Sequence, residues 1–129
     1  MYDITIYYKK DSYKMSEMLN QSSVSSRELE ILLKEREEGN ADFLLVDVRE
    51  MMEYDSGHIK GADMLKPTST FQSWSQEFLE INKEKTVIFT CRSGNRSGQV
   101  QNVFRSNGME NVINHSGGII SYSGERQVG

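Results

Sequence analysis

Three short apolar runs, each bounded by polar residues, constrain the fold of this chain more than any other feature. They are DFLLVDV (residues 42–48), KTVIFT (85–90) and ENVINH (110–115). Continuous apolar runs with β-branched members are typical of strands buried on both faces. Segments with helical spacing of apolar residues precede and separate them, at residues 25–40, 68–82 and 96–108. This alternation predicts an α/β domain with a mainly parallel sheet.

The composition suits one soluble globular domain and disfavours nucleic acids and membranes as partners. The chain has 129 residues and a formal net charge of -4, whereas a general nucleic-acid binder usually carries a basic field. No apolar run approaches the roughly 18 residues that a membrane-spanning helix needs, and the first residues do not resemble a signal peptide. One cysteine cannot form an internal disulfide, and the few Cys and His residues lack zinc-site spacing. We therefore expect a cytoplasmic protein without a metal.

The pattern divides the chain into an N-terminal extension, residues 1–23, and a domain, residues 24–129. In the extension, Ile4, Ile6 and Tyr8 alternate as on one face of an edge strand. We interpret the rest of the extension as a linker or a loosely packed helix. Within the domain, Ser25 and Glu28 have the spacing of a capping box and mark a helix start.

The single cysteine, Cys91, directly follows the run KTVIFT and begins the segment CRSGNRS, here called the cysteine loop (residues 91–97). In parallel sheets, ligands bind beyond the carboxyl ends of the strands, which is where Cys91 is expected. We expect a helix to begin near Arg96 or Ser97. Gly94 allows the loop to curl so that backbone N–H groups point inward, and such a nest at a helix N-terminus favours an anion. The same field lowers the pKa of a thiol and favours the nucleophilic thiolate.

The other loop residues fit this chemistry. Arg92 and Arg96 add positive charge and forked donors, and Ser93 and Ser97 can donate hydrogen bonds. A thiolate in this setting could attack an anionic substrate and carry the transferred group, as a persulfide or as a thiophosphate ester. The alternative is a buried structural thiol, because free cysteine is among the most buried residue types.

Three separated motifs resemble the single-domain rhodanese family over about residues 23–122. They are LLVDVREMMEYDSGHIKGA, the cysteine loop CRSGNRS, and NVINHSGGIISY. The resemblance implies a five-stranded, mainly parallel sheet flanked by helices on both faces. It also implies a thiosulfate sulfurtransferase in which Cys91 carries sulfane sulfur as a persulfide, bound by Arg92, Ser93, Gly94, Asn95, Arg96 and Ser97, with no cofactor. The donor would be a small anion such as thiosulfate or polysulfide, and the acceptor a thiol or a protein.

The length of the cysteine loop distinguishes this chain from phosphatases that share the rhodanese fold. Four residues lie between Cys91 and Arg96, whereas related dual-specificity phosphatases have five. The shorter loop suits a sulfur atom better than a phosphate group, so a phosphatase or an arsenate reductase is disfavoured. An enzyme with small donors and a sulfur carrier loaded by a partner protein both remain open. Under the second hypothesis the N-terminal extension would be a docking or dimer strand.

Three further residues of the motifs are expected to support the loop. Asp47 and Arg49 could orient it or form an ion pair that fixes the turn, with Glu53 as a candidate third member. His58 could be a general base, but the resemblance implies a structural role. His115, Ser116, Met109 and Tyr122 depart from the family pattern in the closing segment, which bears on acceptor specificity rather than on sulfur chemistry.

Overall fold

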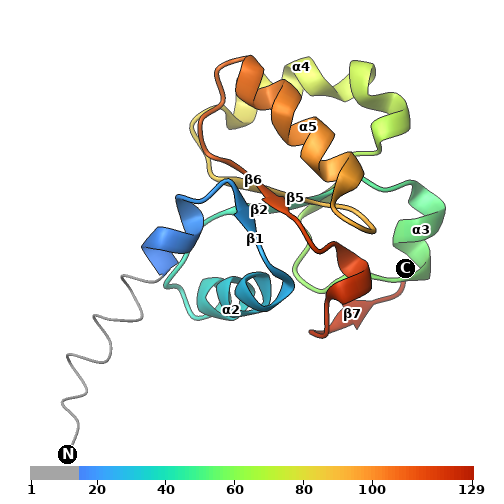
Figure 1. The fold of residues 1–129 in the computed structure, drawn as a ribbon. Coiled ribbons are helices and arrows are strands. Elements are labelled where there is room, and N and C mark those ends of the chain that lie inside the picture. Colours follow the sequence, from blue (N-terminus) through green and yellow to red (C-terminus); the bar gives the residue numbers. More distant parts are fainter. Residues whose placement is uncertain (1–14) are drawn as a thin grey trace, which may run out of the picture.

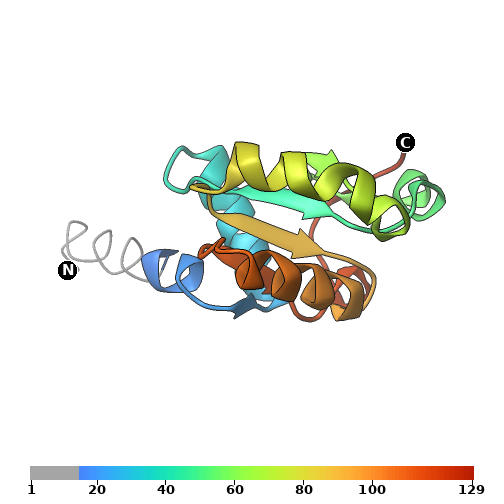
Figure 2. The ribbon, with the colours of Figure 1, turned by 90° about the horizontal axis from the view of Figure 1, so that it is seen from above.

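Five parallel strands form the central sheet in the computed structural model, which describes residues 15–129. Their order across the sheet is β1-β6-β5-β2-β4. Their bounds are Ser23–Val24 for β1, Leu44–Asp47 for β2, Met64–Leu65 for β4, Val87–Thr90 for β5 and Val112–His115 for β6. Figure 2 shows the strands running in one direction. The expected α/β class with a parallel five-stranded sheet is confirmed.

Helices cover both faces of this sheet. They are α2 (Ser26–Glu37), α3 (Met51–Ser56), α4 (Phe71–Asn82) and α5 (Asn95–Ser106), with the 3-10 turns η1 (Thr68–Thr70) and η2 (Ile119–Ser121). Helices α4 and α5 lie on one face and α2 on the other (Figure 1). A small antiparallel pair, β3 (His58–Ile59) with β7 (Arg126–Gln127), adjoins the sheet. The capping box expected of Ser25 and Glu28 is present at the start of α2.

Each central strand contributes side chains to two separate cores, because successive side chains of a strand point to opposite faces. Leu45, Ile88 and Ile113 pack with Leu29 and Leu32 of α2. On the other face the core is dominated by aromatic rings that surround Phe104 of α5. These rings are Phe71, Trp74, Phe78 and Phe89, with centroids 5.0 to 6.0 Å apart in each contacting pair. A strand end between two packed cores is a rigid platform for the loop that follows β5.

The N-terminal part of the described chain packs onto the domain. Met15 and Met18 are buried in the α2-side core, and residues 15–19 are helical. Strand β1 pairs with β6, so the expected boundary between residues 23 and 24 falls inside a strand of the main sheet. The strand expected at residues 4–8 lies outside the described residues. No helix among residues 15–129 is long and apolar enough to cross a membrane.

The aromatic core predicts how strongly α5 is held to the sheet. Phe104 is 2% exposed, whereas its neighbour Val103 is 44% exposed. We expect Phe104→Ala to lower the free energy of unfolding by about 3–5 kcal/mol, because it leaves a cavity among four aromatic rings. Urea denaturation measures this change, and Val103→Ala is the matched control with an expected loss below about 1 kcal/mol. Equal losses in the two variants would contradict this account of the core.

Candidate functional site

Cys91 lies where β5 ends and the cysteine loop begins. The strand VIFT is fully buried, and the loop turns into α5 after Gly94, the N-cap residue, whose φ is 91°. Because φ is positive there, glycine can adopt this turn without strain. Cys91 is 1% exposed, and its side chain faces the N-terminal end of α5. The helix begins at Asn95, one residue before the expected start.

Three hydrogen-bond donors converge on the sulfur atom. The backbone N–H groups of Gly94 and Ser97 lie 3.2 and 3.4 Å from Sγ, and the Ser97 hydroxyl lies 3.3 Å away. Burial raises the pKa of the Cys91 thiol, but the hydrogen bonds from Ser97 and from the backbone of Ser93 and Gly94 outweigh it, so the pKa is below its ordinary value. Hydrogen bonds to the charged form stabilise the thiolate. This is the nest expected from the sequence, and it favours a nucleophilic sulfur.

The loop keeps its N–H groups directed inward because its carbonyl groups are held from outside. The N–H of Ile119 donates to Cys91 O at 2.9 Å, and the N–H of Ile120 donates to Arg92 O at 3.0 Å. The side-chain amide of Asn114 donates to Gly94 O at 3.1 Å. Within residues 15–129, no acceptor binds the backbone N–H groups of Arg92, Asn95 and Arg96. These backbone donors have no partner in the described part of the chain.

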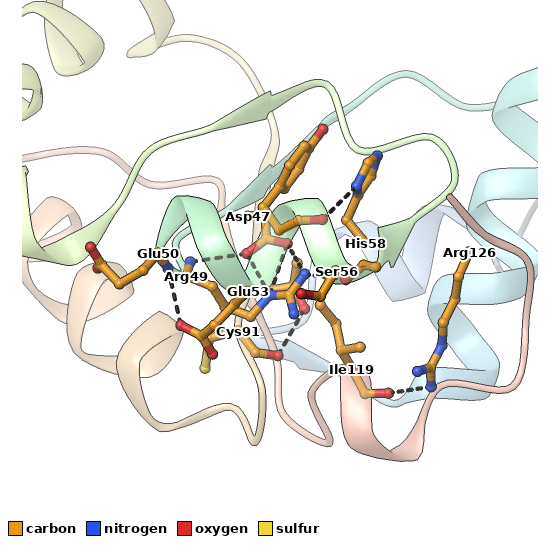
Figure 3. A network of polar contacts seen from close by, with 12 residues as sticks. Asp47, Arg49, Glu50, Glu53, Ser56, His58, Cys91, Ile119 and Arg126 are labelled. Atoms are coloured by element: carbon orange, nitrogen blue, oxygen red, sulfur yellow. Dashed lines mark hydrogen bonds and ion pairs between the residues drawn. The ribbon is translucent and has the colours of Figure 1, made fainter. Parts of the chain in front are cut away.

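Residues 116–120, which include the donors to the Cys91 and Arg92 carbonyl groups, lie very close to the cysteine loop. A Cβ on Gly118 would lie 2.2 Å from Arg92 O, and a Cβ on Gly94 would lie 2.2 Å from Ser116 O. Glycine is therefore needed at both positions. Arg126 of β7 donates to the carbonyl oxygens of Ile119 and Tyr122, both at 2.8 Å. Figure 3 shows this chain of contacts from Arg126 through Ile119 to Cys91.

The two arginines of the cysteine loop have different surroundings. Arg92 is exposed and has no carboxylate partner among the described residues. Arg96 forms a forked ion pair with Glu53 of α3, at 2.7 Å from Nη1 and 2.9 Å from Nη2. The hydrogen bond from Arg96 lowers the pKa of Glu53 to about 2. Ser93 and Asn95 are exposed on the outer side of the loop.

Asp47 and Arg49 form a buried ion pair beside this site. Both carboxylate oxygens of Asp47 accept from the Arg49 guanidinium at 2.9 to 3.1 Å, and Arg49 also donates to Gly57 O at 2.7 Å. The side chains are 0% and 7% exposed. Glu53, the candidate third member, pairs with Arg96 instead. The Asp47–Arg49 pair and its contact with Gly57 connect the end of β2 to the end of α3 (Figure 3).

His58 is held away from the sulfur by its own helix turn. Its Nδ1 donates to the carbonyl oxygen of Tyr54 at 3.0 Å, and its ring stacks on the Tyr54 ring at 3.7 Å. The imidazole is 4% exposed, and among the described residues it makes no hydrogen bond to Cys91. These contacts fit the structural role implied for His58. The hydrogen bonds that lower the pKa of Cys91 come from Ser97, Ser93 and Gly94.

The structure adds Asn114 and His115 to the surroundings of the loop and gives Glu53, which was expected beside Asp47 and Arg49, a different partner. The sequence signal for Glu53 was its place in the EYDSGH motif, three residues after Glu50, whose backbone N–H it also caps at 3.0 Å. No local pattern singles out Asn114. His115 was noticed only as a departure from the family pattern. It is 0% exposed and bridges Thr90 Oγ1 at 2.8 Å and Ser26 Oγ at 2.7 Å.

The donors at the sulfur predict the reactivity of the thiol. We expect Ser97→Ala to raise the pKa of Cys91, because the change removes the hydroxyl that donates to the thiolate and keeps the backbone N–H. The pH dependence of alkylation by iodoacetamide measures this pKa, and its midpoint should move to higher pH. Ser106→Ala, at the far end of α5, is the matched control and should leave the midpoint in place. An unmoved midpoint in Ser97→Ala would show that the hydroxyl does not stabilise the thiolate.

The buried imidazole predicts a pH dependence of stability. Burial lowers the pKa of His115 to about 4, so the folded protein keeps this ring neutral where the unfolded chain protonates it. The stability it contributes is complete above the unfolded pKa of about 6.5 and is lost as pH falls toward the folded value. Between pH 7 and 5 this loss amounts to about 2 kcal/mol. Urea denaturation at both pH values should show it, and His115→Gln should reduce the difference. The same pH difference in the variant would exclude His115 as its source.

Comparisons with known proteins agree with this geometry. The sequence pattern of the family described as "Rhodanese-like domain" matches residues 28–125. Among solved structures, a rhodanese-like domain protein from Staphylococcus aureus superposes with a TM-score of 0.68 and 26% identity, over 84% of this chain and 99% of that one. A structure described as rhodanese with anions, from E. coli, has a TM-score of 0.57 and 25% identity, over 68% of this chain and 100% of that one.

Curated relatives are similar over a shorter stretch. A tRNA uridine(34) hydroxylase from Photorhabdus laumondii is 36% identical over 87 residues, and one from Yersinia enterocolitica is 34% identical over 85 residues. The matches cover 65% and 64% of this chain but only 24% of each relative. The family pattern spans most of the chain. It includes the cysteine loop, the ion pairs around it, and residues 116–120, which contact the loop. The chain therefore belongs to the rhodanese-like domain family.

Proposed function

We propose that this protein is a sulfurtransferase in which Cys91 accepts a sulfane sulfur atom, carries it as a persulfide and passes it to a thiophilic acceptor. The convergence of three donors on a buried sulfur at the N-terminus of α5 carries this proposal. A lowered pKa increases the fraction of the thiol that is present as the nucleophilic thiolate. Family membership supports the same chemistry.

The transfer balances with groups that the chain and the donor supply. The Cys91 thiolate attacks the outer sulfur of the donor, and the donor's S–S or S–S(O₃) bond breaks. The electron pair leaves with sulfite if the donor is thiosulfate, or with a thiolate if it is a persulfide. The product, Cys91–S–S⁻, places its charge among the backbone N–H groups of the cysteine loop, since these point inward. Attack by an acceptor on the outer sulfur then restores the thiolate.

Phosphoryl transfer fits the site less well. A phosphate group develops charge on three oxygen atoms and is usually bound by a free arginine and several N–H groups. Here both Nη atoms of Arg96 are occupied by Glu53.

The names of the curated relatives refer to tRNA, but the net charge of -4 gives this chain no general attraction to RNA. We therefore propose a sulfur donor as the substrate, with a thiol or a protein as the acceptor.

The test is the intact mass of the reduced protein after incubation with thiosulfate or with an organic hydropersulfide. We expect a gain of one sulfur atom, released by cyanide, because the nest stabilises the persulfide. Cys91→Ser should gain none, and Ser106→Ala, exposed at the far end of α5, is the control and should gain sulfur as the wild-type protein does. A sulfur gain in Cys91→Ser would contradict the role of Cys91. If the folded protein with a free thiol gained sulfur from neither donor, sulfur transfer from small donors would be wrong.

Turnover separates an enzyme from a carrier. An enzyme releases thiocyanate repeatedly when donor and cyanide are both in excess. A carrier loaded by a partner protein gives no more than one equivalent.

A further inference from the structure

Arg126 lies outside the main sheet but contacts the segment that holds the cysteine loop. It belongs to β7, which pairs with β3. Its Nη2 atom donates to the carbonyl oxygens of Ile119 and Tyr122, both at 2.8 Å (Figure 3). Among residues 15–129 its guanidinium has no carboxylate partner. Because a charged donor forms stronger hydrogen bonds than a neutral one, this guanidinium polarises the carbonyl groups that it contacts.

The carbonyl of Ile119 begins a chain of two peptide groups that ends at the sulfur. Its peptide group also contains the N–H of Ile120, which donates to Arg92 O at 3.0 Å. The carbonyl of Arg92 shares its peptide group with the N–H of Ser93, and this N–H donates to the sulfur of Cys91. In a trans peptide group the N–H points away from the C=O. A positive charge at the first carbonyl is therefore connected to the last N–H donor.

The chain is suited to transmit this polarisation. Hydrogen bonds in series strengthen one another, because each bond polarises the next peptide group, and the effect is larger in a buried site than in water. The two peptide groups are packed so closely that a Cβ on Gly118 would lie 2.2 Å from Arg92 O. The carbonyl of Ile119 also accepts from the N–H of Tyr122 at 3.0 Å. Loss of Arg126 would therefore remove the charge and leave the turn η2 closed.

We propose that Arg126 is a positioning residue that stabilises the thiolate of Cys91 through the peptide groups 119–120 and 92–93. Arg126 does not touch the sulfur and takes no part in bond formation. The inference rests on the proposed sulfur transfer and deepens it, because the thiolate is the group that attacks the donor. It gives the small antiparallel pair β3–β7 an effect on the reactivity of a cysteine in another part of the fold.

Other charged groups at this end of the sheet act on the sulfur through space. They are Arg92 and Arg96 of the cysteine loop, Asp47 and Arg49 at the end of β2, Glu50 and Glu53 at the start of α3, and Lys66 after β4. None of these side chains donates to the carbonyl of Ile119, and none is altered by a substitution of Arg126. The exposed guanidinium of Arg126 also acts through space, but salt screens that interaction much more than it weakens a chain of hydrogen bonds.

The first test is the pH dependence of alkylation of Cys91 by iodoacetamide. Arg126→Gln removes the charge and keeps an amide donor. We expect its midpoint to move to higher pH by about 0.3 unit, which lowers the thiolate fraction below the midpoint about twofold. The shift should remain in about 0.5 M potassium chloride. Arg126→Lys keeps the charge and should bring the midpoint back toward the wild-type value. Lys60→Gln removes an exposed charge beside β7 that does not contact η2, and in the same salt it should leave the midpoint in place.

The amide protons show whether the effect passes along the chain. Spectra are compared at a pH where the thiol is ionised in both proteins. In Arg126→Gln the amide protons of Ile120 and Ser93 should be more shielded than in the wild-type protein, because their hydrogen bonds are weaker. The N–H of Gly94 also donates to the sulfur, at 3.2 Å, but its peptide group does not belong to the chain. Its proton is the internal control and should move less.

The outcomes separate this inference from the proposed function. An unmoved midpoint in Arg126→Gln would overturn the inference, and a shift that disappears in salt would assign the effect to charge through space. Equal movement of the Gly94 amide proton would also overturn it, because the loop as a whole would then have loosened. None of these measurements uses a sulfur donor. Failure of the folded wild-type protein to gain sulfur would therefore overturn the proposed function without bearing on the role of Arg126.

Discussion

The hydrogen bonds from the backbone of Ile119 and Ile120 to the carbonyl oxygens of Cys91 and Arg92 are the constraint on which the site depends. A peptide group has its N–H and C=O on opposite sides, so holding the carbonyl outward directs the N–H groups of the loop inward. The sulfur therefore meets N–H dipoles and the N-terminus of a helix instead of apolar side chains. Burial alone would raise its pKa, and these contacts reverse that effect.

The same constraint explains why glycine is needed at position 118. Gly118 must approach the carbonyl of Arg92 so closely that a Cβ would collide with it. The segment is itself held by Arg126 of β7 and by the buried ring of His115, which connects α2 to the end of β5. The small antiparallel pair and the buried histidine thus serve the loop although neither touches the sulfur.

Charge at the site is arranged by a second set of contacts. Buried or half-buried ion pairs contribute little net stability, because the desolvation of both partners offsets their attraction. Their effect here is on the site: Asp47 fixes Arg49 to the turn after β2, and Glu53 occupies Arg96. The positive potential at the sulfur then comes mostly from backbone dipoles.

Much of this protein follows from its sequence. The apolar runs identified β2, β5 and β6, and the capping box identified the start of α2, because periodicity and capping act within a segment. The edge strands β1 and β4 have two residues each and carry no periodic signal, so only pairing with their neighbours defines them. The sequence also identified Cys91 and its loop as the candidate site. The tertiary structure alone decided the partner of Arg96, because Glu53 lies 43 residues away and reaches it only when α3 and α5 pack at the same end of the sheet.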